Sequence, residues 1–339
     1  MEKIAVVILN WNGRALLERY LPGVVAHSDP HPVYVVDNDS SDDSKEYVVS
    51  NFPQVQWIQT GENLGYAGGY NKGLASIHEP YAVLLNSDVR TTPGWLNPIA
   101  DHFAAHPNCA ALQPKILWDR QPDSFEYAGA SGGFIDALGY PFCRGRILHH
   151  LESDIGQYNQ PRKVFWATGA CLALKTSVFK ELGGLDPMLF AHMEEIDLCW
   201  RMQRAGYDIW VQPESTVFHL GGATLQMDSP RKTFLNFRNN LSILVKNLPH
   251  HQAMALVFVR LILDGVAGFK FLFEGKPKHT FAIIKAHFAF YGRFSKIQRA
   301  RAATAKHPFK KLSALTGTYS GSMVWQVYAK GKSKFSEFY

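Results

Sequence analysis

The sequence predicts an α/β fold, in which helices flank a mostly parallel sheet and a helical extension follows at the C-terminus. Over residues 4–88, short apolar runs alternate with segments of helical character, and polar residues cluster where the apolar runs end. From about residue 231 the pattern changes to apolar residues at helical spacing among many Lys and Arg. Strands that alternate with helices are typical of a parallel sheet with helices on both faces.

The N-terminal elements follow in order from these patterns. Continuous apolar runs predict buried strands, whereas Ser and Asp before a longer segment predict the start of a helix. The predicted strands are 4–10, 33–36, 55–59 and 81–85, and the predicted helices are 15–25, 41–52 and a short one after the glycine-rich stretch 61–73. Beyond these, we expect loops with short strands at 119–160, a strand pair at 164–175, a helix at 194–206 and strands at 209–212 and 216–219.

Composition and charge divide the 339 residues into two regions. Hydrophobic residues make up 46% and charged residues 19%, which excludes a wholly disordered chain. Residues 1–230 carry 16 basic and 26 acidic side chains, a net charge of −10, whereas residues 231–339 carry 19 and 3, a net charge of +16. We therefore expect a catalytic domain over 1–230 and a basic helical region over 231–339 with different surroundings.

The basic region predicts an anionic partner. Its most apolar stretch, 251–273, is interrupted by Arg260, Asp264 and Lys270, so it lacks a run of about 20 apolar residues that could span a bilayer. A helix lying on an anionic membrane surface fits this pattern better than nucleic acid, for which no recognisable binding module is present. The alternative is that the region packs on the catalytic domain or forms a homodimer.

Cysteine usage and the N-terminus indicate a location. Cys109, Cys143, Cys171 and Cys199 show no metal-ligand spacing, and the first apolar run, 4–9, is too short for a secretory signal. We expect free thiols in the cytoplasm, with the protein at the inner face of the plasma membrane.

Polar clusters end two of the predicted strands. The first is VDNDSSD, residues 36–42, and the second is LLNSD, residues 84–88. In parallel sheets, ligands bind at the carboxyl ends of strands. Carboxylates there can accept hydrogen bonds from a nucleotide, and Asp88 can hold a divalent cation beside a diphosphate. The alternative for each cluster is a turn whose side chains cap a helix.

A glycine-rich segment, NLGYAGGYNKG at 63–73, allows a close approach of backbone to a ligand. The alternative is a flexible loop before a helix. Neither G-x-G-x-x-G after the first strand nor G-x-x-x-x-G-K-[ST] occurs, which disfavours a nicotinamide-binding Rossmann enzyme and a P-loop NTPase.

An acidic segment and a histidine complete the pattern. EEIDLCWR, residues 194–201, places three carboxylates at the start of a predicted helix. One of them can serve as a general base, although acids also favour the first turn of a helix through its dipole. His219 follows an apolar strand in VFHLGG, and it is a metal-ligand candidate if it faces Asp88.

Taken in this order, the motifs resemble those of the family 2 glycosyltransferases with the GT-A fold, especially the bacterial rhamnosyltransferase-like members that build cell-surface polysaccharides. The chain supplies NWNG, VDNDSSD, NLGYAGGYNKG, LLNSD, EEIDLCWRMQRAG and HLGG over residues 4–225. Each piece is weak alone, but six in the family's order are specific. The resemblance implies a donor-binding half at about 1–115 and an acceptor and catalytic half at about 116–230.

The resemblance also implies roles for individual residues. The metal, Mg²⁺ or Mn²⁺, would be held by Asp88 and His219. The donor nucleotide would lie against Asn10, Asn12, Asp37, Asp39, Gly65, Asn71, Asn86 and Ser87. The acceptor side would include Trp166, Thr168, Gly169 and His192, with Trp166 either stacked on a sugar or buried in the core.

The base is where the sequence departs from the family. The family's E-D pair, whose second member is the usual base, is here Glu194-Glu195. The additional methylene of Glu195 extends its reach by about 1.5 Å, so either the backbone compensates or Glu194 or Asp197 acts instead.

The implied reaction is a direct displacement with inversion, from a UDP- or dTDP-sugar to a hydroxyl of a glycan or lipid-linked acceptor. Two alternatives stay open. A sugar nucleotidyltransferase resembles a G-x-G-x-R-rich first loop, which NWNGR does not supply. A non-catalytic nucleotide-sugar binder finds its only support in Glu195.

Overall fold

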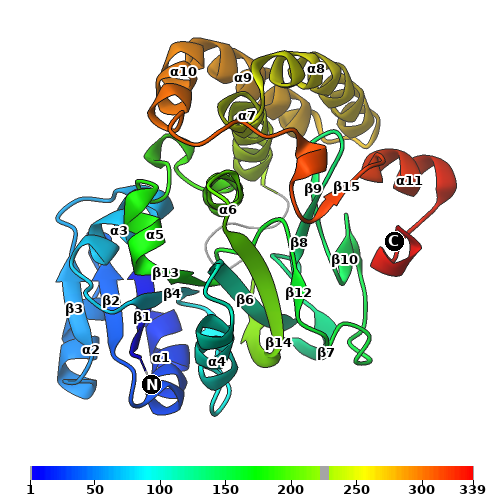
Figure 1. Ribbon diagram of the computed structural model, residues 1–339. Coiled ribbons are helices and arrows are strands. Elements are labelled where there is room, and N and C mark those ends of the chain that lie inside the picture. The colour runs from blue at the N-terminus through cyan, green and yellow to red at the C-terminus, as the bar shows by residue number, and fades with distance from the viewer. Residues whose placement is uncertain (1, 222–228, 339) are drawn as a thin grey trace.

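Two β-sheets organise the computed structural model, which describes residues 2–221 and 229–338 (Figure 1). The strands of the larger sheet are β1 (Ile4–Asn10), β2 (Val33–Asp37), β3 (Gln56–Gln59), β4 (Tyr81–Asn86), β5 (Val89–Arg90), β6 (Cys109–Trp118), β7 (Gln121–Phe125), β12 (Arg162–Lys163), β13 (Cys171–Lys175) and β14 (Asp208–His219). The strands of the smaller sheet are β8 (Gly133–Asp136), β9 (Pro141–Cys143), β10 (Arg146–Ile147), β11 (His150–Leu151) and β15 (Thr318–Tyr319).

The helices cover the larger sheet and form a layer at one end of the molecule, at the top in Figure 1. They are α1 (Arg14–Ser28), α2 (Ser44–Asn51), α3 (Gly65–Ala75), α4 (Asn97–Ala105), α5 (Thr176–Glu181), α6 (Glu194–Arg204), α7 (Pro230–Asn247), α8 (His250–Phe273), α9 (Pro277–Gly292), α10 (Phe294–Ala303) and α11 (Met323–Lys330). Helices α7 to α10 make up the end layer. No described helix is long and apolar enough to cross a membrane.

The predicted fold class is confirmed. The larger sheet runs in the order β12-β14-β6-β13-β4-β1-β2-β3, and the pairs β1–β2, β2–β3, β1–β4 and β6–β14 are parallel. Strand β13 lies antiparallel between β4 and β6. The two strands predicted at 209–212 and 216–219 are one strand, β14, whose register shifts between Gln212 and Thr216.

Alternation along β1 explains the two-sided core. Ile4, Val6 and Ile8 pack on one face with α1, α2 and α4, whereas Ala5 and Val7 pack on the other with α3 and α6. Because both faces of β1 are covered, its sequence is apolar at every position from Ile4 to Leu9 rather than at every second one. All four cysteines are buried and unpaired.

The glycine-rich segment is itself the helix α3, not a loop before one. A Cβ on Gly69 would lie 2.5 Å from the Leu9 side chain, and a Cβ on Gly73 would lie 2.5 Å from that of Val36. The glycines therefore let α3 lie directly on β1 and β2.

A buried ionic cluster joins α6 to α7. Asp197 on α6 is fully buried and accepts hydrogen bonds from Arg201 (2.8 Å), Lys246 (2.8 Å) and the Asn247 side chain (2.8 Å). Lys246 also pairs with Asp186 at 2.5 Å. Through this cluster the first helix of the basic region holds the acidic helix in place.

We predict that Lys246→Met lowers the free energy of unfolding by about 3 kcal/mol, because removing one member of a buried ionic cluster leaves the other charges uncompensated. Urea denaturation measures the change. The control is Lys45→Met on the exposed face of α2, which should stay within about 0.5 kcal/mol of the parent protein. Equal stabilities of the two variants would contradict the role given to the cluster.

Candidate active site

The polar ends of β1, β2 and β4 meet at one edge of the larger sheet. Asn10 lies opposite Asp37 in the parallel register of β1 and β2, and Leu9 lies opposite Asn86 in that of β1 and β4. The Asn10 side chain donates to Asp37 Oδ1 at 3.0 Å, while its own Oδ1 is buried without a partner among the described residues. An unpartnered buried acceptor at a strand end marks a place where a ligand donor fits.

The Asp37 carboxylate is already well satisfied. It accepts hydrogen bonds from Asn10, from the Ser40 backbone and hydroxyl, and from Gln59 Nε2 at 2.9 Å. Four donors fill the usual capacity of a carboxylate. Asp37 can thus accept from a nucleobase only if one partner gives way, and the exposed Gln59 is the partner that moves at least cost.

Two further residues at this edge belong to the predicted motifs but were not predicted as site residues. Asn38 is buried, donates to Asn63 and Gly65, and accepts from the Leu64 backbone, so it fastens the start of α3 to the end of β2. Trp11 exposes 51% of its surface between Asn10 and Asn12. An exposed indole beside polar groups can stack on a nucleobase.

Asn12 and Asp39 form the turns of this edge. Both have positive φ angles, 49° and 66°, which Asn and Asp tolerate better than other side chains. The Asn12 side chain accepts from the Ser41 backbone at 2.7 Å, so it shapes the turn as well as facing solvent. Asp39 is exposed.

Asp88 and His219 come together as the sequence predicts. His219 Nε2 lies 3.1 Å from Asp88 Oδ1, and the Asn86 side chain lies 3.4 Å from the same nitrogen. Ser87 is half-buried between these two motif residues. The other ring nitrogen, Nδ1, lies 3.3 Å from Glu126 Oε1. No sequence pattern pointed to Glu126, because it lies in the irregular segment at 119–160.

Electrostatics at His219 favour its charged form. Burial lowers the pKa of His219, but the carboxylates of Glu126 and Asp88 outweigh burial and raise it to about 10. The imidazolium therefore bridges two carboxylates. To bind a metal ion, the ring must lose a proton, and Glu126 can then hold the remaining N–H and orient the ring.

The donor set fits a divalent cation only in part. One carboxylate oxygen and one imidazole nitrogen at hydrogen-bonding distance can share an ion such as Mn²⁺. Among the described residues, no group of three or more His, Cys, Asp or Glu could hold a metal ion by itself. A cation at Asp88 and His219 would consequently need further ligands, which diphosphate oxygens and water supply.

The Glu194-Glu195 pair lies at the start of α6. Glu194 is buried, Glu195 is half-buried, and each has one oxygen without a hydrogen-bond partner among the described residues. Burial raises the pKa of Glu195 to about 7, although backbone hydrogen bonds from Ile196 and Gly169 oppose the rise. Burial and the charge of Glu195 raise the pKa of Glu194 well above its usual range. Glu195 is therefore the first of the two to ionise.

The backbone at Gly169 and Ala170 connects the two halves of the site. The Gly169 backbone lies close enough to the Glu195 carboxylate to lower its pKa, and the Gly169 carbonyl accepts from the Tyr66 hydroxyl at 2.7 Å. The Ala170 carbonyl accepts from the Asn86 backbone at 3.0 Å. The strand end that carries Asp88 and the helix start that carries Glu195 thus lie on two sides of one short turn.

A strained loop sets the start of α6. Phe190, His192 and Met193 all have φ angles between 66° and 75°, which non-glycine residues seldom adopt. The Asn239 side chain on α7 holds this loop by donating to the carbonyls of Leu189, Ala191 and His192 at 2.8–2.9 Å. Gly65 contacts the same loop: its φ is +69°, and a Cβ there would lie 2.9 Å from the Phe190 ring.

Three predicted site residues are committed to structural contacts instead. Trp166 is 4% exposed and donates to the Phe134 carbonyl at 3.0 Å, so its ring is not free to stack on a sugar. Asn71 donates to and accepts from the Leu185 backbone, which uses both ends of its amide. Both oxygens of Asp197 are bonded in the buried ionic cluster, which argues against Asp197 as the base.

The remaining acceptor-side residues differ in what they offer. The Thr168 hydroxyl is buried and bonded to the Ala128 carbonyl, so it is a structural group. His192 Nε2 is buried without a partner among the described residues, and burial followed by the charge of Lys232 lowers the pKa of His192 to about 4. A neutral imidazole two residues before Glu194 can donate a hydrogen bond to an acceptor hydroxyl or accept one from it.

Comparison with known proteins gives consistent matches. The family model described as glycosyl transferase family 2 matches residues 5–183. N-acetylglucosaminyl-diphospho-decaprenol L-rhamnosyltransferase of Mycobacterium tuberculosis is 29% identical over 240 residues, 64% of this chain and 75% of that protein. Low-salt glycan biosynthesis hexosyltransferase Agl10 of Haloferax volcanii is 23% identical over 290 residues, 82% of this chain and 88% of that protein.

Solved structures share the fold. GalNAc-T7 with UDP, GalNAc and Mn²⁺ has a TM-score of 0.57 at 15% identity, covering 74% of this chain and 49% of that chain. Staphylococcus aureus TarS 1–349 in complex with UDP-GlcNAc has a TM-score of 0.53 at 15% identity, covering 90% and 91%. At this identity the likeness supports the GT-A fold alone.

Proposed function

Because the chain belongs to glycosyl transferase family 2, we propose that it is an inverting, metal-dependent enzyme that transfers a sugar from a UDP- or dTDP-sugar to a hydroxyl of a glycan or lipid-linked acceptor. One observation carries the proposal. The Asp88–His219 pair and the Glu194-Glu195 pair lie on two sides of the turn at Gly169 and Ala170. A donor diphosphate and an acceptor hydroxyl can therefore be held on opposite sides of one sugar.

On the donor side, the nucleotide would lie along the ends of β1 and β2. Trp11 would stack on the base, and Asn10 and Asp37 would hydrogen-bond its edge or the ribose. Asp88 and His219 would hold a divalent cation, which when bound neutralises charge on the departing diphosphate. Glu126 would keep the His219 ring oriented toward that cation.

On the acceptor side, Glu195 would remove the proton from the attacking hydroxyl. Its pKa of about 7 suits a base at neutral pH, because the deprotonated form is well populated and still accepts a proton. Glu194 would stay protonated, since two adjacent buried carboxylates resist carrying two charges. The hydroxyl would then attack the anomeric carbon opposite the diphosphate, which inverts the configuration.

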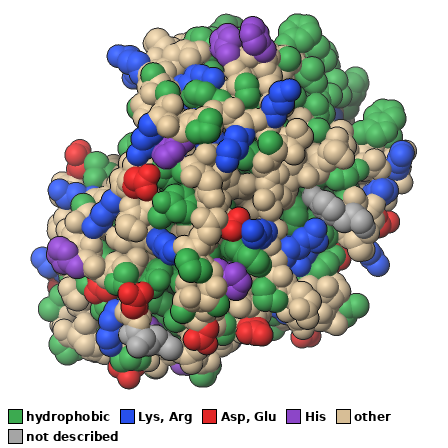
Figure 2. Space-filling model, viewed as in Figure 1, with side chains coloured by type: hydrophobic (Ala, Val, Ile, Leu, Met, Phe, Trp, Pro, Cys, Tyr) green, Lys and Arg blue, Asp and Glu red, His purple; other side chains and the backbone are tan. Residues whose placement is uncertain are grey.

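The acceptor would be reached at a membrane surface. Helices α8 and α9 expose a row of apolar side chains at helical spacing, which Figure 2 shows gathered at the upper right. These residues are Phe258, Ile262, Val266, Phe269 and Phe273 on α8, and Phe281, Ile284, Phe288 and Tyr291 on α9. Together with the net charge of +16 over 231–339, this face fits insertion into the inner leaflet, from the cytoplasmic side.

The first test is turnover of nucleotide sugars. In a panel of UDP- and dTDP-sugars, we expect hydrolysis or transfer with Mn²⁺ or Mg²⁺ and none with chelator. Asp88→Asn should lower the rate by at least about 100-fold, because it removes a charged ligand. Asp101→Asn, on the exposed face of α4, is the control and should keep parent activity. If the Asp88→Asn variant depended on the metal ion as strongly as the parent protein, the assignment of Asp88 as a metal ligand would be wrong.

The second test is the pH profile of transfer. Glu195 acts only when deprotonated, so kcat/KM should fall about tenfold for each pH unit below about 7 and level off above it. Glu195→Gln should lower kcat by at least about 100-fold with little effect on donor binding. Glu194→Gln is the matched variant and should keep most of the activity. The reverse ranking of the two variants would assign the base to Glu194.

The third test is binding to vesicles. The full chain should float with vesicles of phosphatidylcholine and phosphatidylglycerol at low salt, and less so as salt rises. Phe269→Asp with Phe288→Asp should abolish flotation, whereas Val49→Asp, an exposed apolar position on α2, should not. If the parent protein stays in solution, or if the double variant instead breaks up a homodimer, the membrane proposal is wrong.

A further inference from the structure

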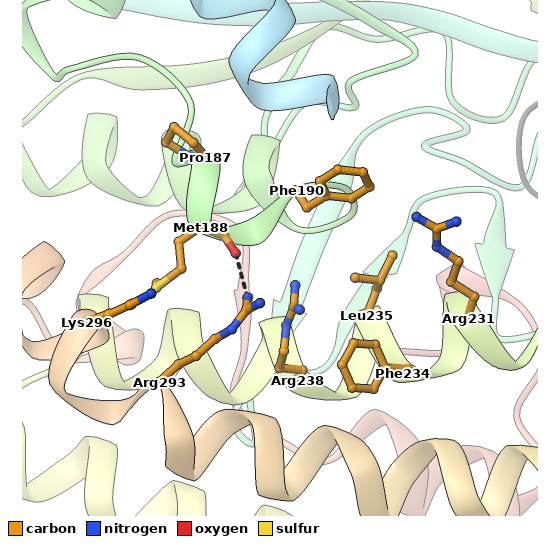
Figure 3. Close-up of a pocket in the computed structure, with 9 residues that line it drawn as sticks. All are labelled: Pro187, Met188, Phe190, Arg231, Phe234, Leu235, Arg238, Arg293 and Lys296. Atoms are coloured by element: carbon orange, nitrogen blue, oxygen red, sulfur yellow. Dashed lines mark hydrogen bonds between the residues drawn. The ribbon is translucent and has the colours of Figure 1, made fainter. Parts of the chain in front are cut away.

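A basic pocket lies between the strained loop and the helical layer (Figure 3). Its volume is about 630 Å³, and it is formed by the 3₁₀ turn Pro187–Leu189, by α7 and by the start of α10. Figure 3 shows Lys296 and Arg293 on the side of Met188, and Arg231 on the side of Phe190. The lining residues are Pro187, Met188, Phe190, Arg231, Phe234, Leu235, Arg238, Arg293 and Lys296.

The residues that line the pocket include several cations and no acidic side chain to neutralise them. Four of its nine lining residues are cations and none is an acid. Within residues 2–221 and 229–338, no ion pair joins Arg231, Arg238, Arg293 or Lys296 to a carboxylate. Arg238 and Arg293 donate instead to the carbonyls of Leu189 (3.0 Å) and Met188 (3.1 Å). Like charges held together in this way favour a multivalent anion in the space between them.

The cations are held in place before any anion arrives. Arg238 is 4% exposed, and its Nε also donates to Asn239 Oδ1 at 2.9 Å. Burial, followed by the charge of Arg293, lowers the pKa of Arg238 to about 10, so it is still protonated at neutral pH. Arginines fixed by carbonyls keep their remaining N–H groups for a ligand, and the guanidinium fork matches phosphate oxygens.

The rest of the lining is apolar. Phe190, Phe234 and Leu235 provide a wall, with the Arg231 guanidinium 5.7 Å from the Phe190 ring centre and that of Arg238 5.1 Å from the Phe234 ring. Free phosphate has no apolar group that could pack against such a wall. The combination suits an anion that is covalently joined to a hydrocarbon group.

The pocket lies between the catalytic loop and the exposed apolar face. On one side lies Phe190, four residues before Glu194. Its ring contacts Gly65, and its carbonyl accepts from the Tyr66 backbone at 3.2 Å. On the other side, the exposed residues Phe288 and Tyr291 lie on the last turns of α9, which ends directly before Arg293. A ligand that passes from membrane to active site would meet this pocket between them.

We propose that this pocket binds the diphosphate group and the adjoining isoprenoid units of a lipid-linked acceptor, so that the acceptor sugar reaches Glu195. The inference rests on the proposed function and names the acceptor class for that site. Four cations match a diphosphate, which carries more than one negative charge, better than the single charge of a phospholipid diester. The hydrocarbon chain would leave along the apolar wall toward α9.

The test uses farnesyl diphosphate as a short isoprenoid probe on the full chain, in chelator, so that the metal-dependent donor site does not compete. Calorimetry should show one site that binds the probe at least about tenfold more tightly than inorganic diphosphate or dihexanoylphosphatidylglycerol. Arg231→Gln with Lys296→Gln should weaken binding of the probe by at least about tenfold. Both side chains are exposed, and neither makes a hydrogen bond or ion pair with another described residue, so the variant should fold.

The matched control is Lys278→Gln with Arg299→Gln, which removes the same charge from exposed positions outside the pocket and should leave binding unchanged. Equal loss in both double variants would show a general charge effect and overturn the proposal. The proposal would also be overturned if inorganic diphosphate bound as tightly as the probe, because the apolar wall would then have no role. Equally tight binding of the phospholipid would overturn it too, because the pocket would then be a headgroup site.

Failure of the pocket can be separated from failure of the proposed function. Hydrolysis of the nucleotide sugar by water needs no acceptor, so Arg231→Gln with Lys296→Gln should hydrolyse donor at the parent rate. Donor hydrolysis without pocket-dependent probe binding would overturn only the pocket. Pocket-dependent probe binding without turnover of any nucleotide sugar would support the pocket and overturn the transferase proposal.

Discussion

The buried cluster around Asp197 is the constraint on which the acceptor half of the site depends. The Asp197 carboxylate accepts hydrogen bonds from Arg201 on its own helix and from Lys246 and Asn247 on α7. Lys246 also forms an ion pair with Asp186 at the start of the loop. An ionised carboxylate with no exposure is stable only if all its partners are present. The acidic helix can therefore occupy one position relative to α7, and the loop between Asp186 and Glu194 is held at both ends.

Three carboxylates within four residues consequently reach different states. Asp197 is the one with cationic partners, which hold its pKa well below the usual range despite burial. Among the described residues, no cation acts on Glu194 or Glu195, so burial raises both pKa values and the pair resists a second charge. One sequence motif thus supplies a fixed ionic anchor at Asp197 and the proposed base at Glu195, and the difference lies in the partners that α7 contributes to Asp197.

The sequence predicted that the polar strand ends meet at one edge of the sheet, because that information is local. An apolar run followed by Asp or Asn places the polar group at a strand end, and parallel strands bring such ends together, as with Asn10, Asp37 and Asp88. Glu126, Asn239 and the pocket cations could not be found in this way. They act across long distances in the chain, and nothing in their own neighbourhoods differs from ordinary loop or helix sequence. Trp166 and Asn71 show the converse: each fits a motif, but contacts with Phe134 and Leu185 decide its role.

The strained loop fixes the point at which α6, with Glu194 and Glu195 in its first turn, begins. Phe190, His192 and Met193 hold left-handed conformations that cost about 1 kcal/mol or more each, and Asn239 offsets part of that cost with three hydrogen bonds. Phe190 joins this loop to two neighbouring features, because its ring packs against Gly65 and the same residue lines the basic pocket.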